Sequence, residues 1–273
     1  MSGYGINCEE ETKFAFEWAG ELEKRKVKAD IVHINDLIAK PEMLSQYDIL
    51  AFPGGFSYGD DTGSGKAFAN KFRNHLAKEL EEFLGRDTLA IGICNGFQII
   101  TNLGIVPGAL THNESAQYID RWVDLEVPSS PLPRGRSGGG RVRSVSPWLQ
   151  NIKKISLPIA HGEGRYIIDA KGYKELLKNN QIAFKYDKGA MCDYQNLPAN
   201  PNGAMHDIAG VVAYNGRVLG LMPHPERGMF FHHRPDFQLQ KEILKRKNGK
   251  IPEEGFGLVI FKNAIQYFNE RSK

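Results

Sequence analysis

Short apolar runs alternate with amphipathic stretches along the first third of the chain. Runs at 27–34, 47–52 and 88–93 are short and rich in β-branched or large apolar residues, which predicts strands. The stretch at 63–84 predicts a helix, because large apolar side chains recur there at steps of three or four residues. Another helix is expected after 88–93, ending at Gly104. This alternation predicts an α/β fold with a mainly parallel, flavodoxin-like sheet and helices on both faces.

The rest of the chain is less regular. RWVDLEV (121–127) alternates like a strand, whereas 128–143 is rich in Pro, Gly and Arg and is expected to form a loop. The apolar run at 208–222 divides at Asn215-Gly216, which predicts an antiparallel hairpin. An amphipathic helix is expected at 256–268. No repeat or linker divides the chain, so we expect a single domain spanning 1–273.

Composition narrows the classes of function. Of 273 residues, 41% are hydrophobic, and 35 basic against 32 acidic side chains give a net charge of +3. So small a charge favours neither nucleic acid nor a membrane as partner. No apolar run approaches the roughly 20 residues of a membrane-spanning helix. Three widely spaced cysteines predict no disulfide framework, so a reducing, cytoplasmic location is expected.

The segment AIGICNGFQII (90–100) places a cysteine between two glycines at the end of an apolar run. Its core, Gly92-Ile93-Cys94-Asn95-Gly96, has the form of a nucleophile elbow, a tight strand-to-helix turn that exposes the nucleophile. The following helix would favour the thiolate, and the N–H of Asn95 would be half of an oxyanion hole. A buried core cysteine at a strand end would match the same pattern, so the motif alone leaves both interpretations open.

A thiolate nucleophile needs a base and a group that orients the base. His224 follows an apolar strand, and Pro225 favours extended backbone at His224. That conformation brings Glu226 to the same side, as the third member of a triad. His232 and His233 are neighbours whose side chains do not converge, so no metal site is predicted.

The second oxyanion donor is expected from another glycine-rich loop at a strand end. Pro53-Gly54-Gly55-Phe56 follows the run at 47–52 and would let the backbone approach a substrate closely, although a plain turn would look the same. Ligands bind at the carboxyl ends of strands in open parallel sheets. Three such loops together therefore favour catalysis, with Cys94 as nucleophile.

Longer segments around these residues resemble one known family. The chain is similar to the glutaminase subunit of phosphoribosylformylglycinamidine synthase, a class I (triad-type) glutamine amidotransferase. The resemblance is carried by FPGGFSYGDD, GICNGFQII, PGAL with His112-Asn113-Glu114-Ser115, AHGEGRY, NPNG and GRVLGLMPHPER. Together with the N-terminal turn that begins at residue 3, these segments extend to about residue 228, which is most of the chain.

The resemblance implies a role for each candidate residue. Cys94 would attack the side-chain amide of glutamine, His224 would protonate the departing ammonia and then activate water, and Glu226 would orient His224. The oxyanion hole would comprise Gly55 and Asn95. The glutamine would be held by Gly54, Gln98, Asn113 and Ser115, with His161 and Glu163 lining the mouth of the site or a partner interface. Cys8 would lie near the site without a base of its own, and Cys192 would have no role.

The resemblance also implies a larger assembly. Ammonia would pass to a large synthetase subunit that uses ATP and Mg to convert formylglycinamide ribonucleotide to formylglycinamidine ribonucleotide in purine biosynthesis. A small accessory subunit is expected as well. No cofactor is expected in this chain, because it has no phosphate-binding loop.

Two features depart from the family pattern. The family has a short apolar strand before the G-x-N-C turn, whereas here Met1 stands almost at that turn. We therefore expect a gap beside the strand at 27–34, and either a natural start upstream of Met1 or the loss of that strand from the chain as given. Residues 229–255 are longer and more basic than the compact core of the family requires, and contact with a partner is their expected role.

Three alternatives stay open. One is a glutaminase that serves another synthetase, and another is a cysteine hydrolase with the same type of elbow. The H-P-E motif after a strand argues against the second. The third is an inactive subunit that only binds a synthetase. The presence of Cys94, His224 and Glu226 argues against this third alternative.

Overall fold

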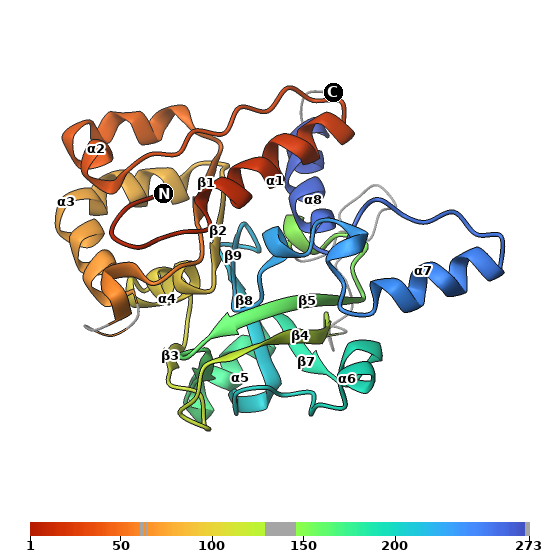
Figure 1. Ribbon diagram of the computed structural model, residues 1–273. Coiled ribbons are helices and arrows are strands. Elements are labelled where there is room, and N and C mark those ends of the chain that lie inside the picture. Colours follow the sequence, from red (N-terminus) through yellow and green to blue (C-terminus); the bar gives the residue numbers. More distant parts are fainter. Residues whose placement is uncertain (61–62, 64, 129–145, 271–273) are drawn as a thin grey trace.

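A computed structural model describes residues 1–60, 63, 65–128 and 146–270, and Figure 1 shows the arrangement of the elements. The main sheet has seven strands in the order β1-β2-β9-β8-β7-β4-β5. In chain order these are β1 (Ile49–Phe52), β2 (Leu89–Ile93), β4 (Ile119–Glu126), β5 (Lys154–His161), β7 (Ile182–Asp187), β8 (Ile208–Ala213) and β9 (Val218–Leu221). A separate antiparallel pair comprises β3 (Ala109–Thr111) and β6 (Arg165–Ile167).

The prediction of a mainly parallel sheet is wrong. Only β1 with β2 and β2 with β9 pair in parallel among the described strands of the main sheet. The hairpin predicted at Asn215-Gly216 is confirmed as β8 and β9, and it reverses the chain direction. From there to β5 every neighbouring pair is antiparallel. The fold is therefore α/β with a mixed sheet, whose parallel part is confined to three strands.

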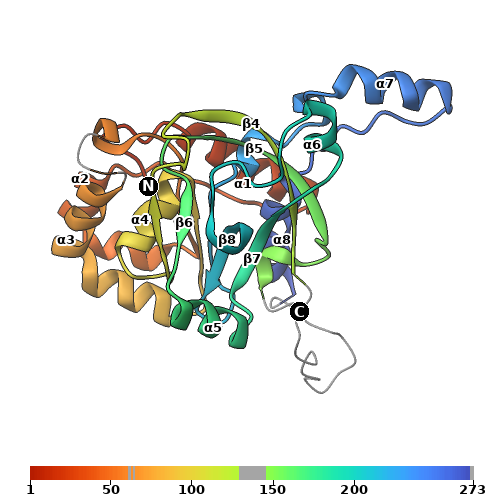
Figure 2. The same ribbon diagram turned by 90° about the horizontal axis from the view of Figure 1, so that it is seen from below.

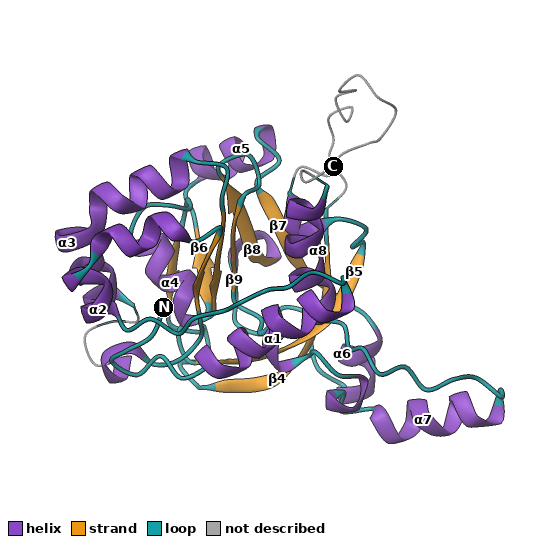
Figure 3. Cartoon of the chain, turned by 90° about the horizontal axis from the view of Figure 1, so that it is seen from above, coloured by secondary structure: helices purple, strands orange, loops and turns teal. Residues whose placement is uncertain are grey.

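Helices cover both faces of the parallel strands, as predicted. Figure 3 shows α3 and α4 on one side of the strands and α1 and α8 on the other. The α-helices are α1 (Glu9–Leu22), α2 (Ile34–Ala39), α3 (Lys66–Gly85), α4 (Asn95–Asn102), α5 (Ala170–Lys178), α6 (Ala190–Gln195), α7 (Phe237–Arg246) and α8 (Leu258–Asn269). The helices expected at 63–84 and 256–268 are thus confirmed as α3 and α8. Among the helices of the described ranges, none combines the length and apolarity needed to cross a membrane.

The parallel strands lie in the hydrophobic core. All five residues of β2 are buried, as expected for a strand with helices on both faces. On one side α4 packs against β1 and β2, and on the other α1 and α8 pack together, with the rings of Phe16 and Phe261 5.0 Å apart. This packing holds the loops after β1, β2 and β9 at one edge of the sheet.

The structure agrees with some of the remaining predicted segments and differs from others. The strand predicted at 121–127 is confirmed as β4. The segment 27–34 is extended but forms no strand, and only His33 makes an isolated bridge, to Ser2. The loop predicted at 128–143 falls almost entirely outside the described residues. Within 229–255, α7 extends away from the rest of the molecule without a buried residue, as Figures 1 and 2 show.

Candidate active site

Three neighbouring parallel strands end at the same edge of the sheet, and each leads into a loop that carries candidate residues. Gly54 and Gly55 follow β1, Cys94 follows β2, and His224 follows β9. The backbone N–H of Cys94 donates to the carbonyl of Leu221 at 2.9 Å, which fixes the second loop beside the third. The predicted convergence of these loops is confirmed.

Cys94 lies on a strained turn between β2 and α4. Its φ of 50° and ψ of −106° are unusual for a residue with a side chain, and such strain is typical of a nucleophile elbow. The turn packs so tightly on β1 that a Cβ at Gly96 would lie 1.8 Å from the carbonyl oxygen of Phe52. Glycine is therefore required at position 96, and the cysteine is held at the amino end of α4.

His224 and Glu226 form a buried pair beside this turn. Nδ1 of His224 lies 2.5 Å from Oε1 of Glu226, and both side chains are almost fully buried. The backbone N–H of His224 donates to the carbonyl of Pro158 at 2.8 Å, so the loop is attached to β5 as well. Nε2 of His224 has no protein partner among the described residues. The ring thus has one nitrogen engaged with Glu226 and the other available for chemistry.

The charge of His224 follows from its neighbours. Burial by itself lowers the pKa of an imidazole, but the Glu226 carboxylate and the charge of Cys94 outweigh burial and raise the pKa of His224 well above 6.5. At neutral pH His224 is therefore an imidazolium, and it lies beside the elbow that carries Cys94.

The glycine-rich loop after β1 is packed closely against the histidine. A Cβ at Gly54 would lie 2.5 Å from Cε1 of His224, so no larger residue fits. The N-terminal turn holds this loop from outside, because the N–H groups of Asn7 and Cys8 donate to the Gly54 carbonyl at 3.2 and 3.1 Å. Asn95 accepts a hydrogen bond from the N–H of Ser57 through its side chain at 3.2 Å. The elbow and the glycine-rich loop after β1 are therefore joined directly.

The predicted glutamine-binding residues lie in different surroundings. Gln98 is buried and bonds Asn95 (2.7 Å) and the carbonyl of Glu163 (2.6 Å). Asn113 is also buried, and its amide bonds the segment 161–164 and Gln117. Ser115 is exposed and accepts a hydrogen bond from the N–H of Gln117 at 3.3 Å. In this structure the side-chain amides of Gln98 and Asn113 are therefore engaged in hydrogen bonds within the protein.

Of His161 and Glu163, His161 is the more deeply buried. It is buried at the end of β5, and its Nδ1 is 3.1 Å from Oδ1 of Asn113. Burial, together with the nearby charge of His224, lowers the pKa of His161 to about 3, so this ring is neutral at physiological pH. Glu163 is partly exposed, and its carboxylate lies 3.6 Å from Nδ1 of His112. Of the two, only Glu163 stays near the surface.

Two further side chains were not predicted from the sequence. Tyr118 is half-exposed, its ring lies 6.1 Å from that of Phe56, and burial together with the charge of Cys94 raises its pKa. Arg227 donates through Nη2 to the sulfur of Cys8 at 3.2 Å. Arg227 directly follows the H-P-E motif, which could have indicated it, whereas no local pattern distinguishes Tyr118 from other loop aromatics.

Cys8, His224 and Glu226 also form a set of potential metal ligands. One donor atom from each lies within 4.8 Å of the others, and all three residues are buried. However, Nδ1 of His224 and Oε1 of Glu226 already bond each other, and the guanidinium of Arg227 is in contact with the Cys8 sulfur. A fixed positive charge at one ligand opposes a cation, so this cluster fits acid–base chemistry better than metal binding.

Comparison with known proteins agrees with this geometry. The sequence matches the CobB/CobQ-like glutamine amidotransferase domain over residues 1–268. It is 47% identical to a phosphoribosylformylglycinamidine synthase subunit PurQ from Methanococcus maripaludis, over 99% of this chain and 97% of that protein. A protein of the same name from Dehalococcoides mccartyi is 38% identical over 96% of this chain and 94% of its own length. The structure of PurLQS from Thermotoga maritima matches with a TM-score of 0.60 and 28% identity, over 98% of this chain and 96% of that one.

Proposed function

The chain belongs to the PurQ family of CobB/CobQ-like glutamine amidotransferases, and we propose that it uses Cys94, His224 and Glu226 to release ammonia from glutamine for purine biosynthesis. The observation that carries the proposal is the buried His224–Glu226 pair beside a cysteine elbow. A cysteine, a charged imidazole and an orienting carboxylate are the groups that nucleophilic cleavage of an amide requires.

The reaction proceeds in two stages. The Cys94 thiolate attacks the side-chain carbonyl carbon of glutamine, and Nε2 of His224 then gives a proton to the departing nitrogen, so that ammonia leaves and a glutamyl thioester remains. Water attacks the thioester while His224 takes its proton, which releases glutamate and restores the thiolate. Glu226 holds Nδ1, so that Nε2 faces the reacting groups throughout.

The remaining roles follow from position. The N–H groups of Gly55 and Asn95 stabilise the oxyanion, and Gly54 leaves room for the substrate beside His224. Gln98, Asn113 and Ser115 shape the glutamine pocket, with the amides of Gln98 and Asn113 acting chiefly through the loops that they hold. We place Tyr118 at the solvent side of Cys94.

The ammonia is consumed on another subunit. The T. maritima structure is described as PurLQS, which supports a large synthetase subunit and a small accessory subunit as partners. We place ATP and Mg on the synthetase, where formylglycinamide ribonucleotide becomes formylglycinamidine ribonucleotide, and we place the complex in the cytoplasm. The exposed helix α7 is suited to contact the synthetase, because none of its residues is buried by the part of the chain that the structure describes.

Ammonia release from glutamine tests the proposal, measured with and without the co-purified synthetase. We expect Cys94→Ala to lower the rate by about 1,000-fold or more, because the nucleophile is lost. Cys192→Ala is the matched control, since Cys192 is equally buried but follows the distant strand β7, and it should keep the wild-type rate. Unchanged activity in Cys94→Ala would overturn the mechanism. Glutaminase activity without formylglycinamidine formation would overturn only the pathway.

A further inference from the structure

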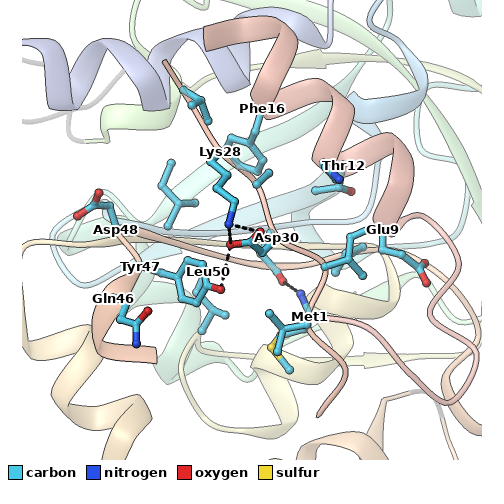
Figure 4. A pocket seen from close by; sticks show the side chains of 18 of the residues that line it. Met1, Glu9, Thr12, Phe16, Lys28, Asp30, Gln46, Tyr47, Asp48 and Leu50 are labelled. Carbon is cyan, nitrogen blue, oxygen red and sulfur yellow. Dashed lines mark hydrogen bonds and ion pairs between the residues drawn. The ribbon is translucent and has the colours of Figure 1, made fainter. Parts of the chain in front are cut away.

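Two hollows in the described part of the chain differ in what lines them. Figure 4 shows the first, a cavity of about 280 Å³ lined in part by α1, β1 and the extended segment 25–32. Its charged side chains include Lys28 and Asp30, which bond each other at 3.1 Å. The second is an open groove of about 700 Å³, lined by residues at the start of α1 and by residues between 226 and 233. Of these two hollows, the groove is the one that contains a residue of the proposed triad, Glu226.

Arg227 connects the groove to the buried surroundings of the triad. This residue is exposed and lines the groove together with Glu11 and Phe14. Its Nη2 donates to the sulfur of Cys8 at 3.2 Å, and Cys8 is fully buried. Arg227 thus links an open surface to a sulfur that solvent does not reach.

The Cys8 sulfur is held beside the His224–Glu226 pair. One donor atom from each of these three residues lies within 4.8 Å of the others. A Cβ at Gly54 would lie 3.4 Å from the sulfur and 2.5 Å from Cε1 of His224, so the sulfur and the ring lie against the same glycine. The backbone of Cys8 is fixed as well, because its N–H donates to the Gly54 carbonyl at 3.1 Å and its carbonyl accepts from the N–H of Thr12 at 3.0 Å. The position of the sulfur is therefore set by α1 and the glycine-rich loop together.

The charges on either side of this contact are complementary. Burial lowers the pKa of Arg227, but the charges of Cys8 and Glu226 outweigh burial and raise it. The second carboxylate oxygen of Glu226, Oε2, is buried and has no hydrogen-bond partner among the described residues. A buried negative charge without a direct partner is costly, and the nearby guanidinium offsets part of that cost.

The contact also fixes the turn that carries the catalytic pair. His224 and Glu226 lie at the short turn Pro225–Arg227, of which Arg227 is the last residue. The reaction needs Nε2 of His224 aimed at the reacting groups while Glu226 holds Nδ1. A displacement of about 1 Å in a catalytic group can cost about 100-fold in rate. A side chain that attaches the end of this turn to α1 therefore bears directly on the rate.

We propose that Arg227 is a positioning residue for glutamine hydrolysis: its guanidinium, bonded to the sulfur of Cys8, attaches the turn Pro225–Arg227 to α1 and so holds His224 and Glu226 in the reacting orientation. Cys8 is the point of attachment and not a second nucleophile. The inference rests on the proposed function, because its effect is exerted through the same triad.

Ammonia release from glutamine, measured with the synthetase present, is compared for Arg227→Ala, Cys8→Ala and the double variant. We expect Arg227→Ala to lower kcat about tenfold or more and to change KM less than about threefold, because the arginine acts on the triad and not on the substrate. The two losses should not add in the double variant, since both changes remove the same attachment. Arg73→Ala is the control and should keep the wild-type kcat, because Arg73 is an exposed arginine on α3 that bonds Asn70 at 3.0 Å.

Added guanidinium separates positioning from a merely structural effect. Because Arg227 lines an open groove, a free guanidinium ion can enter and take the place of the side-chain head that Arg227→Ala removes. At concentrations well below those that unfold the protein, we expect guanidinium chloride to raise kcat of Arg227→Ala at least about fivefold. It should leave the double variant unchanged, because the Cys8 sulfur is then missing. Sodium chloride at equal concentration controls for ionic strength.

Three outcomes would each overturn the proposal: a wild-type kcat in Arg227→Ala, additive losses in the double variant, or no rescue by guanidinium. All three leave the proposed function intact when Cys94→Ala abolishes ammonia release, whereas release that persists in Cys94→Ala overturns the function itself. The Tm of every variant is measured alongside. If Arg227→Ala does not fold, Arg227→Met replaces it in the kcat comparison, because methionine keeps much of the side-chain length without its donors.

Discussion

In the proposed mechanism, Glu226 acts on the reaction through His224. The two side chains are buried together 2.5 Å apart, so the carboxylate both fixes the ring and stabilises its charged form. Removing that charge removes the largest influence that raises the pKa of His224, so the pKa falls. His224 would then lose, at a lower pH, the proton that it gives to the departing ammonia.

Glu226→Gln is therefore expected to lower kcat by about 100-fold or more and to move the alkaline limb of the pH–rate profile to lower pH. Ammonia release measured as a function of pH checks both effects. Glu242→Gln on the exposed helix α7 is the control and should leave the profile unchanged. A Glu226→Gln profile that coincides with the wild type would contradict the assigned role.

His161 predicts a pH dependence of stability. Its pKa is about 3 in the folded protein, against about 6.5 for an unfolded histidine, so the unfolded chain binds an additional proton between these values. Stability is therefore lost as the pH falls below about 6.5. Between pH 7 and pH 5 this one group should remove about 2 kcal/mol of the free energy of unfolding.

Urea unfolding of the wild type and His161→Gln at pH 7 and pH 5 measures this contribution. The variant should lose less stability than the wild type over the same interval, because a glutamine binds no proton. Comparison of the two proteins cancels the contribution of other groups, such as the amino group of Met1. An equal loss in both would show that His161 is accessible to protons in the folded state.

Among the elements, the elbow has the strictest geometric requirement. A Cβ at Gly96 would lie 1.8 Å from a backbone oxygen of β1, whereas nothing lies within 4 Å of a Cβ at Gly85 at the end of α3. Gly96→Ala should therefore cost about 3 kcal/mol or more, or prevent folding. Gly85→Ala should leave stability unchanged or raise it by up to about 1 kcal/mol. Chemical denaturation of the two variants checks this contrast, and equal stabilities would contradict the packing of the turn.

Local pattern predicted some elements better than others. The strand at 88–93, the helix at 63–84 and the hairpin at Asn215-Gly216 were recognised because their signals are local: burial, helical spacing and a turn dipeptide. The segment 27–34 has strand-like composition, but a strand also needs a hydrogen-bonded neighbour, and only Ser2 supplies one. The prediction that the strands are mainly parallel failed for a similar reason, because apolar periodicity does not encode which strands pair.

The candidate site, like the fold, could be predicted where its signals are local in the sequence. Cys94, His224 and Glu226 were recognisable because each stands in a short motif after an apolar run. The position of Tyr118 and the hydrogen bonds of the Asn113 amide could not be predicted, because both depend on contacts between loops far apart in the sequence.

For the whole molecule, the functional edge is built by the three parallel strands, and the antiparallel strands extend the sheet away from them.

The projecting helix α7 lies apart from the core, with basic residues at its end. We expect Lys245→Glu combined with Lys247→Glu to leave Tm within about 2 °C and to weaken binding to the synthetase, most strongly at low salt. Lys171→Glu with Lys174→Glu on α5 is the control pair. Calorimetric titration of the subunits checks this, and equal affinities for both pairs would rule out α7 as a contact.

The central claim is that Cys94, and not the neighbouring Cys8, forms the covalent intermediate. Rapid acid quenching of the enzyme with glutamine, followed by peptide mass mapping, tests it most directly. We expect one glutamyl group on the peptide that contains Cys94, absent in Cys94→Ala and more abundant when the synthetase is present. A glutamyl group on Cys8, or turnover with Cys94 unmodified and replaceable by alanine, would contradict it.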